Sequence, residues 1–145
     1  MNLITSFSEK RRKKQWNYER RVLRSLSISD LRKDVHQHFF TTIMMDRVSH
    51  MYLEDFCLDV GIDAYLLGSE YGRFGYFGET AEMAKQRCLE DLEIYCEQVA
   101  GQFQAWLKGS VTEEEQYKQL SETFVHRWWE KGFNEGVRRY RMKLH

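Results

Sequence analysis

Apolar side chains recur every three or four residues along most of the chain, which is the spacing of one face of an α-helix. One long stripe lies within residues 79–107, and a second one covers residues 112–144. The inner face of the first stripe consists of Ala81, Ala84, Cys88, Leu92, Tyr95, Val99, Phe103 and Trp106. Strand-like alternation never lasts more than a few residues. The pattern therefore predicts an all-α protein, a helical bundle of about five helices.

Capping residues set the expected limits of the first three helices. Ser6 and Glu9 have the spacing of a capping box for a helix that runs to about residue 26. Ser27 or Ser29 can cap a second helix that continues to residue 44, and Ser49 can cap a third. Spacings of four place one row of the second helix inward: Leu31, Val35, Phe39 and Ile43.

The two long stripes are expected to form a hairpin. Gly109 and Ser110 interrupt the pattern between them, and Thr112 with Glu115 has the spacing of a second capping box. Because two long helices joined by so short a link pack side by side, we predict a long C-terminal antiparallel helical hairpin.

The stretch 61–79, GIDAYLLGSEYGRFGYFGE, differs in composition from both flanking segments. It contains five of the nine glycines, interspersed with aromatic rings. Glycine loses more backbone entropy on ordering than any other residue, so a cluster of glycines favours a turn. We therefore predict that the third helix ends at Gly68 and that residues 61–79 form a joint between two helical halves, packed across one end of the bundle.

Length and composition limit the class of protein. The 145 residues, 42% of them hydrophobic, suffice for a single domain (1–145) with its own core. Proline is absent, which favours helices. Cys57, Cys88 and Cys96 form neither a CxxC pair nor an even set, so we expect reduced thiols. Because no apolar window is long enough for a membrane span and the N-terminus does not resemble a secretory signal, we expect a cytoplasmic protein.

Charge is segregated along the chain, although the net charge is zero. Residues 1–24 carry eight Lys or Arg and two Glu (+6), and residues 127–145 carry six and two (+4), so the middle carries −10. We expect residues 1–15 to form a basic N-terminal arm that frays. Its run Arg11, Arg12, Lys13 and Lys14 can bind phosphates of nucleic acid or anionic lipid, or it can lie against the acidic middle.

Three segments are distinctive strings: KRRKKQWNYERRVLR (10–24), the stretch 61–79, and WWEKGFNEGVRRYRMKLH (128–145). Together they resemble a family of short, uncharacterised cytoplasmic proteins from spore-forming bacilli, a domain of unknown function. The resemblance extends over nearly the whole chain and implies a bacterial protein. It implies no activity, cofactor or catalytic residue.

The rings around Arg73 have the composition of a protein-binding hot spot. We hypothesise that Tyr71, Arg73, Phe74 and Tyr76 bind a protein partner. The alternative is that these rings only fill the end of the bundle. Substitution of Arg73 separates the two, because a packing role predicts a loss of stability and a contact role predicts a loss of binding.

Asp55, Asp59 and Asp63 recur every four residues and therefore share one helix face. Like charges at this spacing repel, so we expect an arginine or a basic end of the chain to compensate them, in preference to a metal ion. An enzymatic alternative has Asp59, Asp63 and His50 as its nominal residues. A deep polar pocket that gathers these side chains would support it.

Histidines provide little further chemistry. His36 and His38 are expected on different sides of their helix, so the two cannot hold one ion together without other ligands. Glu122, His126 and Glu130 form an ExxxHxxxE row, which differs from the ExxH motif of di-iron bundles and is expected to be exposed. No GxSxG, HExxH or phosphate-loop motif is present. We therefore predict no catalytic residue, no metal site and no cofactor.

The last predicted helix contains two features that concern packing. Gly132 and Gly136 lie one turn apart, a spacing that lets another helix approach closely. Adjacent Trp128 and Trp129 point about 100° apart, so both can be buried only if this helix is covered on more than one side.

Taken together, the sequence favours a small cytoplasmic helical protein that is a non-catalytic protein-interaction or regulatory factor. The alternative function is binding of nucleic acid or anionic lipid through the basic N- and C-terminal segments.

Overall fold

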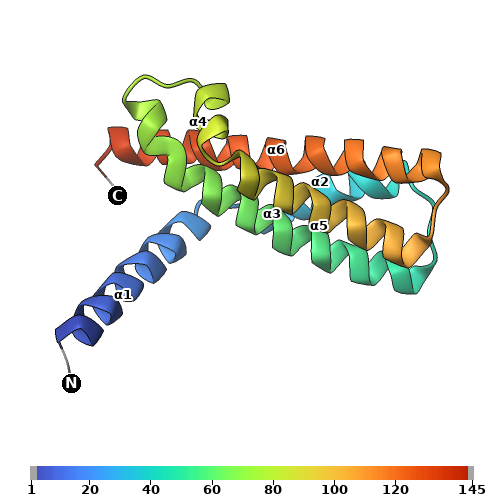
Figure 1. Ribbon diagram of the computed structural model, residues 1–145, viewed down its shortest axis with the longest axis horizontal. Helices are drawn as coiled ribbons and strands as arrows, with labels where there is room; N and C mark the ends of the chain where they lie inside the picture. Colours follow the sequence, from blue (N-terminus) through green and yellow to red (C-terminus); the bar gives the residue numbers. More distant parts are fainter. Residues whose placement is uncertain (1–2, 144–145) are drawn as a thin grey trace.

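The computed structural model describes the backbone of residues 3–143 and the side chains of residues 8–143. Over this range the chain forms six α-helices and one π-helical turn (Figure 1). In chain order they are α1 (Leu3–Leu23), α2 (Ile28–Val35), the π-helix η1 (His36–Phe40), α3 (Arg47–Tyr76), α4 (Ala81–Arg87), α5 (Leu89–Leu107) and α6 (Val111–Arg141). The predicted all-α bundle is confirmed.

The helix caps agree with the sequence only in part. The Ser27 side chain caps α2 by accepting a hydrogen bond from the backbone N–H of Asp30, as expected. Asp46, not Ser49, caps α3, because its carboxylate accepts the backbone N–H of Ser49 at 2.9 Å. The capping box of α6 is Ser110 with Glu113, two residues before the predicted pair. The helix α1 begins at Leu3, so Ser6 lies inside it and does not cap it.

The helix predicted over residues 79–107 is two helices. Cys88 departs from helical geometry (φ −126°, ψ 28°) and separates α4 from α5. The inner stripe nevertheless holds across the break, because Ala84, Cys88, Leu92, Val99 and Phe103 are all buried. Periodicity therefore identified most of the buried face, although Trp106, its last predicted member, is 40% exposed, and it could not detect a bend that preserves that face.

The glycine-rich stretch is not a joint, and this prediction is wrong. The helix α3 continues through Gly61, Gly68, Gly72 and Gly75 to Tyr76, and the chain reverses only over residues 77–80. Gly78 has the positive φ of 108° that the reversal requires. The four other glycines have helical conformations that any residue can adopt, so backbone flexibility does not explain them and we look to packing instead.

Two of those glycines, Gly68 and Gly72, bring α3 into backbone contact with α6, and Gly75 packs against side chains of α6. A Cβ added at Gly68 would overlap the backbone of Trp129, and one added at Gly132 would overlap the carbonyl oxygen of Tyr65. A Cβ at Gly72 would lie 2.5 Å from the Gly136 backbone. Residues further along α3 contact residues further along α6: Gly68 meets Trp129, and Gly72 meets Gly136. The two helices therefore run parallel, as Figure 1 shows. The close approach predicted for Gly132 and Gly136 is confirmed, and its partner is the glycine face of α3.

The helix α5 packs antiparallel to α6 and completes the long C-terminal hairpin that the sequence predicts (Figure 1). Lys108, in the left-handed conformation (φ 49°), ends α5 just before Gly109. Between these helices and η1, the rings of Phe39, Phe103 and Phe124 are fully buried, and the Phe39 ring packs against both of the others. This aromatic cluster joins η1 to the hairpin.

The helix α6 is covered on more than one side, as its adjacent tryptophans require. Trp128 and Trp129 are both buried. On the α2 side, the Asp34 carboxylate accepts hydrogen bonds from Trp128 Nε1 at 2.7 Å and from Arg127 Nη1 at 2.7 Å. On another side, Trp129 stacks on Phe133 and lies beneath Lys85 of α4. These contacts fix α2 and α4 on the central helices.

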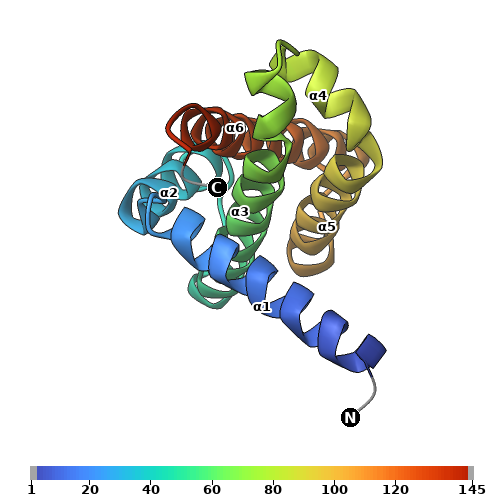
Figure 2. The ribbon, with the colours of Figure 1, turned by 90° about the vertical axis from the view of Figure 1, so that its left-hand side faces the viewer.

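The helix α1 leaves the bundle at an angle, so that its N-terminal half projects outward (Figures 1 and 2). Among the described side chains of α1, Gln15 and the half-buried Tyr18 contact Glu70 and Ser69 of α3, and the fully buried Val22 joins the core. Among residues 3–143, no helix combines the length and hydrophobicity needed to cross a lipid bilayer. Cys57, Cys88 and Cys96 are unbridged, as expected.

Candidate functional site

The end of the bundle where α3 turns into α4 carries a group of aromatic and arginine side chains. We call it the aromatic end and define it by Arg73, Phe74, Tyr76, Phe77 and Arg87. The Phe74 ring has the guanidinium of Arg73 at 4.8 Å and that of Arg87 at 4.1 Å from its centroid. Arg87 is itself fixed by a two-pronged pair with Glu79, its Nη2 lying 2.7 Å from Oε2. Cation–π contacts and this ion pair therefore hold Phe74 in place.

The four residues proposed from the sequence are near one another but differ in exposure. Tyr71 is half-buried and packs against the core, and its ring lies 5.7 Å from that of Phe74. Tyr76 is 46% exposed and contacts Tyr140 of α6. Phe77, which the sequence reasoning left out, is 78% exposed and lies 5.1 Å from Tyr76. Tyr71 therefore fills the end of the bundle, as the alternative interpretation expects, whereas Arg73, Tyr76 and Phe77 face solvent.

The basic run Arg11–Lys14 lies on the projecting half of α1. All four side chains are exposed, and no ion pair joins them to another residue that the structure describes. Trp16, one turn beyond, is 56% exposed and stacks under Arg20 at 4.5 Å. The run is therefore directed to solvent along an isolated helix, away from the acidic middle of the chain.

The residues of the enzymatic alternative do not come together. His50 and Asp59 lie on the same helix, about 13 Å apart along its axis at 1.5 Å per residue. Asp55, Asp59 and Asp63 are exposed, and the ion pairs among the described residues do not include them. Burial, with the nearby charge of Asp59 second, raises the pKa of Asp63.

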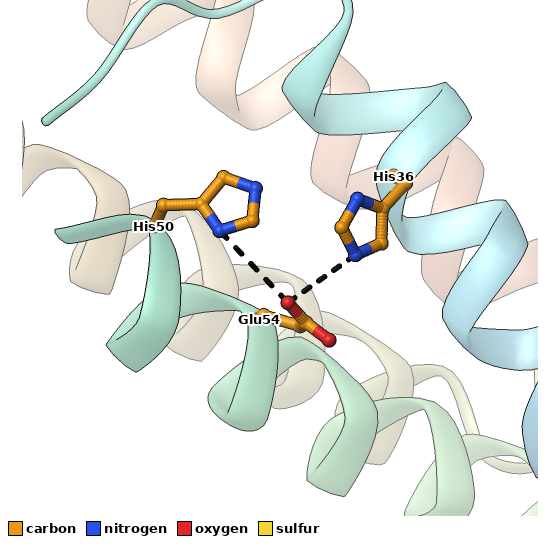
Figure 3. A group of neighbouring side chains, drawn as sticks. All are labelled: His36, His50 and Glu54. Atoms are coloured by element: carbon orange, nitrogen blue, oxygen red, sulfur yellow. Dashed lines mark ion pairs between the residues drawn. The ribbon is translucent and has the colours of Figure 1, made fainter. Parts of the chain in front are cut away.

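A different group converges at the opposite end of α3. His36 of η1 meets His50 and Glu54 of α3, one turn apart on that helix (Figure 3). His36 Nε2 lies 3.2 Å and His50 Nδ1 lies 3.9 Å from the same oxygen, Oε2 of Glu54. The other oxygen, Oε1, accepts a hydrogen bond from Arg32 Nη1 at 2.7 Å. We refer to His36, His50 and Glu54 as the His–His–Glu cluster.

The two histidines of η1 point to different sides, as residues two apart on a helix do. His36 faces α3, while Nε2 of His38 lies 2.6 Å from the backbone carbonyl of Leu120 in α6. Phe39, the residue after His38, enters the core. The expected divergence of His36 and His38 is confirmed, and π turns are frequent at functional sites. The HxxxE spacing of His50 and Glu54 places both on one helix face and is a sequence signal for the cluster. Nothing in the sequence indicates that His36 joins them.

A groove of about 750 Å³ lies between α5 and α6, with Cys96, Ala100 and Gly101 among its lining residues. Four carboxylates also line it: Glu93, Glu97, Glu114 and Glu122. Burial, with the charge of Glu122 second, raises the pKa of Cys96 to about 12, so the nucleophilic thiolate is scarce at neutral pH. Burial and then Lys85 lower the pKa of His126, which also borders the groove. This groove lacks an activated nucleophile.

Comparison with known proteins supports the part of the resemblance that concerns an uncharacterised family. The model of one family, "Protein of unknown function (DUF2521)", matches residues 1–145. The chain belongs to this family. No curated protein and no solved structure matches the chain. Membership of the DUF2521 family thus supports an uncharacterised domain that extends over the whole chain, and arguments about function come from the geometry above.

Proposed function

We propose that this protein is a non-catalytic interaction factor that binds a protein partner through its aromatic end, in the cytoplasm of a spore-forming bacillus. The observation that supports the proposal is the 78% exposure of the Phe77 ring beside the half-exposed Tyr76. Both lie at the end of α3 and in the ordered turn that follows it. A large ring exposed in a fixed position is typical of a binding surface.

The aromatic end is preorganised, which favours binding. Phe74 is held between two guanidinium groups, and Glu79 holds one of them. Backbone hydrogen bonds from Gly78 to Gly75 and from Glu79 to Phe74 close the turn. Because little side-chain or loop entropy remains to be lost there, more of the contact energy contributes to affinity. The exposed Arg73 suits a partner that offers a carboxylate beside an apolar patch.

A pair of substitutions tests this proposal. We expect Phe77→Ala and Arg73→Ala to leave the melting temperature nearly unchanged, because both side chains are exposed, and to abolish capture of the partner from a bacterial lysate. Met44→Ala is the matched control, because Met44 is 97% exposed and lies in the η1–α3 connection, far from the aromatic end. A lower melting temperature with intact capture would show that these side chains only pack the bundle end.

A second candidate function is binding of nucleic acid or anionic lipid through the basic segments. The exposed run Arg11–Lys14 on the projecting half of α1, followed by the exposed Trp16, favours it. Phosphate contacts by such a run release counterions, so binding falls steeply with salt. We expect retention on immobilised heparin at low salt, lost when Arg11, Arg12, Lys13 and Lys14 are changed to glutamine. Passage of the unaltered protein through the column at low salt would exclude this function.

A further inference from the structure

We infer that the His–His–Glu cluster is a binding site for a first-row divalent metal ion, with Zn²⁺ as the representative ion. Two imidazoles and one carboxylate are the ligand set that zinc takes in sites with an open coordination position. The three ligand atoms already lie within 4.8 Å of one another. They come from two elements, the π-turn η1 and the first turns of α3, so the bound ion would connect the two.

The distances are close to those of a bound ion. Tetrahedral zinc with bonds of about 2.0–2.1 Å holds its ligand atoms roughly 3.3–3.4 Å apart. His36 Nε2 and Glu54 Oε2 are 3.2 Å apart, which fits without movement. His50 Nδ1 lies 3.9 Å from that oxygen, and the three ligand atoms lie within 4.8 Å of one another, so the His50 ring would have to move closer to reach the tetrahedral spacing. Figure 3 shows all three side chains directed to one point between η1 and α3.

Neighbouring side chains orient the ligands. Arg32 occupies Oε1 of Glu54 and leaves Oε2 directed to the two histidines. The Phe40 ring packs against both imidazoles, edge-on to His36 at 5.2 Å and tilted against His50 at 4.1 Å. Such outer contacts fix ring orientation in metal sites and raise affinity. The carboxylate is mostly buried and the two imidazoles are partly exposed, so an ion can enter from solvent and keep a water as its fourth ligand.

Binding would act as a clamp. The ion would take the place of the direct contact between His36 Nε2 and Glu54 Oε2 and would bind the imidazoles in their neutral form, so a proton leaves to solvent only from an imidazole that is protonated beforehand. In exchange, η1 and the start of α3 become linked across the connection of residues 41–46. The site lies at the opposite end of α3 from the aromatic end, about 40 Å away at 1.5 Å per residue. It is therefore independent of the proposed protein contact.

The test uses the full-length chain without an affinity tag, titrated with ZnCl₂ in a calorimeter. We expect about one Zn²⁺ per chain and a higher melting temperature with Zn²⁺ present. His36→Ala, His50→Ala and Glu54→Gln should each weaken binding at least about 10-fold, the minimum seen for lost outer contacts. His126→Gln, which removes a histidine on α6, should bind like the unaltered protein. Absence of binding, or equal binding by all four variants, would overturn the inference.

A second measurement needs no variant and so does not depend on how the variants fold. In proton–nitrogen spectra of the unaltered protein, Zn²⁺ should shift the imidazole signals of His36 and His50 at a ratio of one ion per chain. The signals of His38 and His126 should stay in place, because His38 contacts Leu120 and His126 borders the α5–α6 groove. Shifts confined to other histidines would also overturn the inference.

Discussion

The helix α3 makes two contacts of opposite kinds. Against α6 it presents glycines, and the two backbones touch without intervening side chains. Against α1 it presents Ser69 and Glu70, which meet Tyr18 and Gln15 through single hydrogen bonds of 3.4 Å and 2.8 Å. The contact with α6 has no room for an added side chain, because the atoms that such a side chain would meet are backbone atoms that cannot rotate away. The second joins exposed or half-buried side chains and leaves half of α1 outside the bundle.

The difference shows how the fold tolerates its glycines. A helix-interior glycine lowers helix stability by about 1 kcal/mol relative to alanine, so the four in α3 and the two in α6 together destabilise these helices considerably. Close approach offsets this cost, since it adds dispersion contacts along two long helices. The α3–α6 contact is therefore predicted to carry the stability of the bundle, and the α1–α3 contact to contribute little to it.

The largest expected effect comes from filling the space between α3 and α6. Gly132→Ala places a methyl group onto the carbonyl oxygen of Tyr65, and neither backbone can move without separating the helices. We expect a loss of at least about 3 kcal/mol in the free energy of unfolding, measured by chemical denaturation.

The matched control for this substitution is Gly101→Ala. Gly101 is also inside a helix, but a Cβ there meets no atom within 4 Å. Alanine should raise the free energy of unfolding by about 0.5–1 kcal/mol through its higher helix propensity. If Gly132→Ala were as stable as Gly101→Ala, the close contact would not exist as described.

An intermediate effect is expected where α1 reaches the core. Val22 is fully buried, so Val22→Ala should lower the free energy of unfolding by about 2 kcal/mol in the same denaturation assay. Trp16→Ala, on the projecting half of the same helix, removes a larger but mostly exposed side chain and should change it by less than about 0.5 kcal/mol. The reverse order would indicate that the projecting half is docked.

The smallest effect concerns pH at the α1–α3 contact. Burial raises the pKa of Glu70, the hydrogen bond from Gln15 opposes this shift, and the charge of Glu19 adds to it. A raised pKa in the folded state means that the protonated form is favoured by folding, so this contribution to stability is present at low pH and is lost as pH rises. Glu70→Gln should therefore melt slightly higher than the unaltered protein at neutral pH.

This difference should shrink as pH falls from neutrality to the ordinary pKa of a glutamate, about 4, below which the carboxyl is protonated in both the folded and the unfolded state. Glu90→Gln, on the exposed face of α5, is the control. A lower melting temperature for Glu70→Gln at neutral pH would contradict the expected sign.

The sequence was sufficient for the fold class because buried residues follow helical spacing. Leu31, Val35 and Phe39 are buried along α2 and η1, as their spacing of four predicts, whereas Ile43 is buried in the turn that follows, because the helix predicted to reach residue 44 ends at Phe40. The prediction of a joint at residues 61–79 is wrong because it rests on the number of glycines and not on the spacing between them. Gly61, Gly68, Gly72 and Gly75 are separated by seven, four and three residues, which is itself the spacing of one helix face.

The candidate sites show a similar limit. Arg73 and Tyr76 could be selected because their neighbours in sequence are also their neighbours in space. The His–His–Glu cluster could not, because His36 reaches His50 only after the π turn at residues 36–40 and the capped start of α3 have formed. A π turn depends on packing around Phe39 and Phe40 and has no reliable sequence signature.

Hydrogen exchange measured by mass spectrometry tests the contrast between the two contacts of α3 most directly. Backbone amides of residues 66–76 and 129–140, along the glycine contact, should exchange only when the whole protein unfolds, and those of residues 8–16 should exchange orders of magnitude faster. Equal protection of the three segments, or faster exchange along the glycines than in α1, would contradict the account.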